Sequence, residues 1–117
     1  MLTNDDIARV INGHRFNFSN ELELQNGIAT VFAREGIPFQ REFELDKRSR
    51  IDFFIDERIG LEVKVKCSNQ ELARQLMRYA QCNKFASLVL VTSRAMHLAL
   101  PDQINGKDLE VIHLVIF

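Results

Sequence analysis

The chain has 117 residues, of which 46% are hydrophobic and 26% charged, and its formal net charge is −1. This length and balance predict one globular domain over residues 1–117, and the charge argues against a bulk positive field for nucleic acid, although a local patch would suffice. No apolar run approaches the ~20 residues of a membrane span, and the polar start MLTNDDIARV does not resemble a signal peptide. With two cysteines interpreted as reduced thiols, these features predict a cytoplasmic protein without a membrane partner.

The first third of the sequence has the apolar spacing of two helices. Thr3 or Asn4 is predicted to cap a short first helix, and Ser19 or Asn20 is predicted to cap a second one. The second helix carries an apolar stripe formed by Leu24, Ile28, Val31 and Phe32. We expect it to end at Gly36, because glycine is favoured just after the last helical turn.

After the second helix the period of the apolar residues changes from 3.6 to 2, which indicates strands. The elements predicted from this point are strands at 39–45, 49–55 and 60–66, a helix at 68–82, and strands at 85–93 and 109–117. The segment 94–108 is ambiguous and fits a short helix and a loop. A hairpin followed by a strand–helix–strand crossover predicts a mixed sheet with helices on both faces.

The predicted hairpin alternates charged and apolar side chains along both of its strands. Alternation puts Ile51, Phe53 and Ile55 on one face of the first strand and Asp52 on the other. Phe54 shares the face of Asp52, which indicates that this face is partly covered.

Two carboxylates are predicted to face each other across this hairpin. If the turn centres on Glu57, Asp52 lies opposite Glu62 with Cβ atoms about 5 Å apart, and Lys64 follows on the same face. Alternation alone is more typical of a hairpin with its charges in solvent, but facing carboxylates repel. Because Mg²⁺ binds one or two carboxylates and keeps several waters, the pair favours a metal site for phosphodiester hydrolysis.

Asp52, followed after nine residues by Glu62-Val63-Lys64, resembles the D-(x)n-E-x-K motif of the PD-(D/E)XK nuclease superfamily. The resemblance covers residues 19–92 and implies an α/β fold. Its restriction-endonuclease-like α-β-β-β-α-β core would have a mixed central sheet flanked by helices. It also implies that Asp52 and Glu62 hold Mg²⁺ or Mn²⁺ with the carbonyl of Val63, and that Lys64 is catalytic.

Gln75 and Tyr79 add to this resemblance. They are four residues apart, so they share one face of the predicted helix. They resemble the Q-x-x-x-Y motif of a branch of the superfamily that includes recombination exonucleases, which implies a role in substrate binding. In the alternative interpretation Tyr79 is the edge of an amphipathic core and Gln75 is a surface residue.

The superfamily often carries a glutamate near the start of its first core helix. Glu21 is predicted to face the sheet, whereas Glu23 points away, so we favour Glu21 as a third acidic metal ligand and catalytic residue. Both glutamates also fit the first turn of a helix, where the macrodipole and the capping box favour acidic residues.

Basic side chains near the proposed cleft are predicted to contact DNA phosphates, namely Arg48, Arg50 and Arg78. Because no base-reading module is visible, we expect a Mg²⁺-dependent nuclease that acts on DNA ends or on branched or single-stranded DNA, with little sequence specificity. The alternative is a catalytically inactive module of the same fold that binds DNA or a protein partner. The apolar stretch 111–117 offers an edge for a homodimer.

Overall fold

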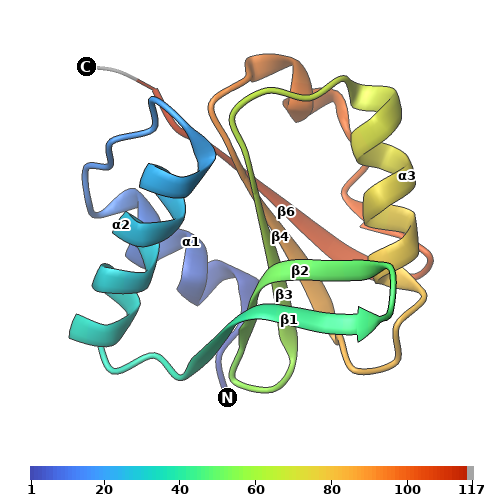
Figure 1. Ribbon diagram of the computed structural model, residues 1–117, viewed down its shortest axis with the longest axis horizontal. Helices are drawn as coiled ribbons and strands as arrows, with labels where there is room; N and C mark the ends of the chain where they lie inside the picture. Colours follow the sequence, from blue (N-terminus) through green and yellow to red (C-terminus); the bar gives the residue numbers. More distant parts are fainter. Residues whose placement is uncertain (116–117) are drawn as a thin grey trace.

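A computed structural model describes residues 1–115, which form a mixed α/β structure. Its elements are α1 (Asn4–Asn12), α2 (Glu21–Arg34), β1 (Phe39–Asp46), β2 (Ser49–Ile55), β3 (Ile59–Lys64), α3 (Asn69–Ala80), β4 (Ser87–Thr92), the 3-10 helix η1 (Ala95–Ala99), β5 (Gln103–Ile104) and β6 (Lys107–His113). The strands form one open six-stranded sheet in the order β1-β2-β3-β4-β6-β5 (Figure 1). β1, β2 and β3 pair antiparallel, and β3, β4 and β6 pair parallel, so the predicted mixed sheet is confirmed.

Side chains cap both N-terminal helices at predicted positions. Thr3 caps α1 in a capping box, in which its hydroxyl accepts from the backbone N–H of Asp6 and the Asp6 side chain accepts from the Thr3 backbone. Asn20 caps α2, and its Oδ1 accepts from the Glu23 N–H at 2.9 Å. The chain leaves α2 through Gly36, whose φ of 72° lies in the left-handed region that glycine adopts without steric cost.

The helices cover both faces of the sheet, with α1 and α2 on one face and α3 on the other (Figure 1). The first face buries a cluster that includes Ile7, Ile28, Phe32, Phe53, Leu61 and Val91. The second face buries a cluster that includes Phe54, Leu72, Leu76, Tyr79, Phe85 and Leu90. Both faces of β3 are therefore shielded from water, which is how its charged residues come to lie in a covered site.

Several element boundaries differ from the predicted ones. β3 ends at Lys64, two residues before the predicted end, and the ambiguous segment 94–108 contains η1 and β5. β6 ends at His113, and Ile116 and Phe117, which belong to the predicted last strand, lie outside the described residues. β5 pairs with β6 only at Lys107 and Asp108. The homodimer that the stretch 111–117 was expected to form stays a prediction. Within residues 1–115, no helix is both long enough and apolar enough to cross a membrane.

Candidate active site

The β2–β3 hairpin has the predicted register. Its paired residues are Phe53 with Leu61, Phe54 with Gly60 and Ile55 with Ile59. These pairs centre on Glu57, so the next pair in the series brings Asp52 opposite Glu62. The prediction that the two carboxylates meet is confirmed.

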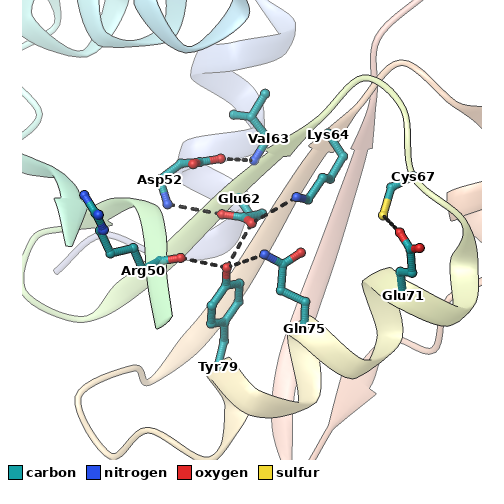
Figure 2. Close-up of polar contacts among 9 residues, drawn as sticks. All are labelled: Arg50, Asp52, Glu62, Val63, Lys64, Cys67, Glu71, Gln75 and Tyr79. Atoms are coloured by element: carbon teal, nitrogen blue, oxygen red, sulfur yellow. Dashed lines mark hydrogen bonds and ion pairs between the residues drawn. The ribbon is translucent and has the colours of Figure 1, made fainter. Parts of the chain in front are cut away.

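At Asp52 and Glu62, hydrogen bonds between side-chain carboxylates and backbone N–H groups connect the two strands. The Val63 N–H donates to Asp52 Oδ2 at 2.8 Å, and the Asp52 N–H donates to Glu62 Oε1 at 3.1 Å (Figure 2). Carboxylate oxygens therefore accept the backbone N–H groups that a continuing ladder would pair with carbonyls. Both carboxylates are held in place by the backbone of the neighbouring strand.

The strands are also irregular at Asp52. The prediction that Ile51 shares the face of Phe53 is wrong. Ile51 packs in the α3-side cluster, whereas Phe53 packs in the cluster under α1 and α2. Regular pairing of β2 is interrupted at Asp52 on both sides, and beyond this point the alternation of faces does not continue to Ile51. On β1, Glu42 lies between Arg41 and Phe43, which pair with Phe53 and Ile51, and its φ of 51° is a left-handed conformation that is uncommon for glutamate.

Glu62 is the most buried charged residue of the site, with only 3% of its surface exposed. It projects toward α3, where its Oε2 accepts a hydrogen bond from the Tyr79 hydroxyl at 2.9 Å. The same oxygen lies 3.5 Å from Nζ of Lys64 (Figure 2). One carboxylate therefore contacts Asp52, Lys64 and Tyr79, which the sequence predicted as parts of one site.

Tyr79 connects three elements through its hydroxyl group. The hydroxyl lies 2.8 Å from the backbone carbonyl of Arg50 on β2 and 2.9 Å from Glu62 Oε2 on β3. Nε2 of Gln75 donates to it at 2.8 Å from the same helix, so the predicted pairing of Gln75 and Tyr79 on one helix face is confirmed. A hydroxyl has one proton, so the Arg50 carbonyl and an ionised Glu62 compete for it.

The electrostatics of the pair favour protonation. Burial, followed by the negative charge of Asp52, raises the pKa of Glu62 to about 8. Burial also raises the pKa of Asp52, although the N–H of Val63 opposes this. Burial alone would lower the pKa of Lys64, but the charges of Glu62, Glu21 and Asp52 outweigh it and raise that pKa. Lys64 is therefore charged at neutral pH, and it offsets only part of the negative charge of an ionised pair.

The donor set fits a small oxygen-preferring cation that keeps most of its waters. It consists of two carboxylates and the adjacent carbonyl of Val63, and Mg²⁺ is commonly bound by one or two carboxylates. Oδ1 of Asp52 accepts no hydrogen bond from residues 1–115, so it is available to a cation. Among residues 1–115, no group of three or more His, Cys, Asp or Glu side chains is placed to hold a metal ion.

The two helix glutamates differ in burial as predicted. No hydrogen bond or ion pair between described residues connects Glu21 to Asp52 or Glu62. Glu21 is partly buried, and its charge contributes to the raised pKa of Lys64, whereas Glu23 is exposed. Glu21 therefore acts on the site electrostatically, and its role as a third ligand stays a prediction.

The three predicted phosphate-binding arginines have different surroundings. The Arg50 side chain is exposed and points away from the carboxylates, so only its backbone carbonyl joins the cluster (Figure 2). Arg78 donates to Ser49 Oγ at 3.3 Å, and with Arg48 and Lys47 it lines an open hollow of about 500 Å³. Ser49 begins β2 and Arg78 precedes Tyr79, so this basic hollow adjoins the carboxylate site.

Sequence reasoning did not identify His97, which is fully buried beside the site. Its Nε2 lies 3.0 Å from the Cys67 carbonyl, and its Nδ1 lies 2.6 Å from Thr92 Oγ1. Because a carbonyl can only accept, Nε2 is the donor, and Nδ1 accepts from the Thr92 hydroxyl. The ring thereby fixes the segment that follows Lys64 against the end of β4. The sequence contains no signal for this role, because His97 is an isolated histidine in the ambiguous segment 94–108.

Comparisons with family models, with curated proteins and with solved structures find no match to this chain. An assignment of function therefore depends on the carboxylate pair and the residues around it.

Proposed function

We propose that this protein is a Mg²⁺- or Mn²⁺-dependent nuclease that hydrolyses DNA phosphodiester bonds and has a restriction-endonuclease-like core. The observation that best supports this proposal is the mutual contact of Asp52 and Glu62 at the point where regular β2–β3 pairing ends. Lys64 lies beside them, 3.5 Å from Glu62 Oε2.

A purely structural role explains this cluster poorly. Two buried carboxylates with one nearby lysine destabilise each other when both are ionised, as the raised pKa of Glu62 indicates. An apolar pair at these positions would make the fold more stable, because even a buried ion pair rarely stabilises a fold more than hydrophobic residues of similar size. A divalent cation removes the repulsion, so a metal site accounts for both carboxylates.

The residues of the cluster have separate roles in this proposal. Asp52, Glu62 and the carbonyl of Val63 would hold the cation, which when bound supplies the charge that polarises a phosphate and activates water. Lys64 would stabilise the charge that develops on the phosphate or orient the attacking water. Tyr79 positions Glu62 through its 2.9 Å hydrogen bond and is a positioning residue in this sense.

The basic hollow supports a substrate with a phosphate backbone. Arg48, Lys47 and Arg78 line it together with one acidic residue, Asp46, so it carries positive charge next to the carboxylate pair. Contacts of this kind position a nucleic acid without reading its sequence. We therefore propose cleavage directed by DNA structure or DNA ends, with little sequence specificity.

Cleavage assays on three substrates test this proposal. Circular single-stranded, linear duplex and branched DNA would be incubated with the protein in Mg²⁺, in Mn²⁺ and in EDTA. The wild type should cleave at least one substrate only with metal, Asp52→Asn should be inactive, and Glu44→Gln, which changes an exposed carboxylate on β1, should cleave normally. If the wild type cleaves none of them, the protein is instead an inactive module of this fold that binds DNA or a protein.

A further inference from the structure

The α1–α2 connection lies near the end of β6 (Figure 1). Residues of both segments line a second hollow, of about 440 Å³. Its aromatic and basic lining residues are His14, Arg15, Phe16, Phe18 and His113. We call it the aromatic hollow. It combines planar rings with positive or protonatable groups, and the proposed catalytic residues do not line it.

The two phenylalanines are only partly buried, although both pack against the core under α1 and α2. Phe16 lies against Gly27, where a Cβ atom would be 3.1 Å from Cδ1 of the ring. A glycine inside a helix destabilises it by roughly 0.5–1 kcal/mol relative to alanine, and here it makes room for the ring. The ring of His14 is 6.4 Å from that of Phe16, so several planar groups border the same space.

The charges around the aromatic hollow favour an anionic ligand. Arg15 is exposed, and within residues 1–115 it forms no ion pair. His14 is bound through Nδ1 to the Val10 carbonyl at 2.8 Å, and its Nε2 is 3.7 Å from Glu35, which offsets its charge when it is protonated. Arg15 is therefore the main partner available for a phosphate.

The aromatic hollow lies near the carboxyl ends of the parallel strands, where β3 ends at Lys64. His113 on β6 is in register with Thr92 on β4, which is in register with Lys64 on β3. Neighbouring strands are about 4.8 Å apart, so the Cα atoms of Lys64 and His113 are separated by roughly 10 Å. The aromatic hollow borders the face covered by α1 and α2, whereas Glu62 projects toward α3. A nucleic-acid strand that contacts both places would pass over the ends of β3, β4 and β6.

We propose that the aromatic hollow binds an unpaired DNA strand, with bases stacked on Phe16 and Phe18 and a phosphate at Arg15. Stacking on aromatic side chains needs bases that are free of their own stack, so an unpaired strand fits better than a duplex. The inference rests on the proposed nuclease function for the class of substrate. It extends that function by selecting single-stranded DNA, or a duplex with a single-stranded tail, as the preferred substrate.

Binding measured without metal tests this inference independently of cleavage. Fluorescence anisotropy in EDTA would follow a labelled oligo-dT, with Phe18→Leu and Arg15→Gln as test variants. Phe43→Leu, a partly buried aromatic on β1, and Arg9→Gln, an exposed arginine on α1, are matched controls. Because Arg15 is exposed, Arg15→Gln remains informative even if Phe18→Leu impairs folding.

We expect Phe18→Leu to weaken binding about 5- to 150-fold, since stacking on one aromatic is worth about 1–3 kcal/mol per base. Arg15→Gln should weaken binding. The slope of the logarithm of the binding constant against the logarithm of the salt concentration should decrease in magnitude by about 1, as expected for the loss of one phosphate contact. An abasic strand of the same length should bind the wild type and Phe18→Leu equally, because it has no base to stack. Both controls should bind like the wild type.

The outcomes separate this inference from the proposed function. If the wild type does not bind oligo-dT, if it binds a blunt duplex as tightly, or if neither test variant differs from its control, the aromatic hollow is not a strand-binding site. If binding behaves as expected but no DNA is cleaved with Mg²⁺ or Mn²⁺, the site stands and the nuclease proposal fails. Normal cleavage together with unaffected binding overturns only the strand-binding inference.

Discussion

The hydroxyl of Tyr79 lies 2.9 Å from Oε2 of Glu62, although the two residues are on different elements that approach each other only in the folded chain. The same hydroxyl bonds the Arg50 carbonyl at 2.8 Å. Helix α3 therefore sets the position of the carboxylate that completes the pair with Asp52. A change in α3 should alter the chemistry of β3 without touching a metal ligand.

Removing this hydroxyl gives the first prediction. Tyr79→Phe should keep the fold but lower the free energy of unfolding by about 1–3 kcal/mol, because buried hydrogen-bonding groups lose their partner. The bond from Tyr79 lowers the pKa of Glu62, so its loss should raise that pKa and move the pH dependence of cleavage to higher pH. Single-turnover rates measured across pH for both proteins check this. A profile with the same midpoint would show that Tyr79 has a packing role only.

Glu62 should also make the protein less stable as the pH rises. Its pKa is about 8 in the folded state and near the ordinary 4.5 when unfolded, so between these values only the folded state keeps the proton. The free energy of unfolding should then fall with pH across this window, by at most about 1.4 kcal/mol per pH unit. Urea unfolding at a series of pH values, without divalent cations, measures the slope.

Glu62→Gln is the matched variant for this slope, because it keeps the shape of the side chain and removes its proton equilibrium. The variant should be more stable than the wild type at pH 8, and its stability should change less between pH 5 and pH 8. An identical slope in both proteins would mean that Glu62 is not the group that titrates.

Lys64 should matter for turnover and not for holding the cation. Lys64→Ala should bind metal at least as well as the wild type, since a positive charge beside the site opposes a cation, and it should retain its affinity for DNA. It should lose about 10²–10³-fold in cleavage rate, the usual effect of one well-placed electrostatic group. Single-turnover cleavage at saturating Mg²⁺ checks this, with Lys66→Ala as the control because Lys66 is exposed and lies beyond the end of β3. Wild-type cleavage by Lys64→Ala would contradict its assigned role.

Gly60 is predicted to be required for packing under α3. An added Cβ atom would lie 2.7 Å from Ile51 Cδ1 and 3.1 Å from Leu88 Cδ2, both in the buried cluster. Gly60→Ala should therefore lower the free energy of unfolding by about 1–3 kcal/mol. Gly13→Ala is the control, because the new Cβ atom would have no contact closer than 3.4 Å. Equal urea midpoints for the two variants would contradict the packing seen at Gly60.

The hairpin register could be predicted from the sequence because side chains alternate with a period of two. A shift of one residue would have turned the apolar residues of β3 to the wrong face, so only a turn centred on Glu57 matched both strands. The register predicted that Asp52, Glu62 and Lys64 share one face, and helical spacing predicted that Gln75 and Tyr79 share one helix face. That the two faces belong to one site was implied by the resemblance to the nuclease superfamily.

The sequence did not predict features that depend on a break in regular structure or on distant backbone groups. Ile51 changes face where regular pairing of β2 is interrupted at Asp52, whereas alternation assumes a regular strand. Arg50 contributes a carbonyl, which every residue has, so no side-chain pattern reveals it. His97 acts through a distant carbonyl and Thr92, and these contacts exist only once η1 packs beside β4.

Calorimetric titration with Mn²⁺ tests most directly whether Asp52 and Glu62 form a cation site. We predict that the wild type binds Mn²⁺ and releases a proton from Glu62, so that the measured heat changes with the ionisation enthalpy of the buffer. Asp52→Asn and Glu62→Gln should lose this binding, and Glu44→Gln should retain it. Absence of binding in the wild type, or equal binding in Asp52→Asn, would contradict the metal site and with it the proposed nuclease.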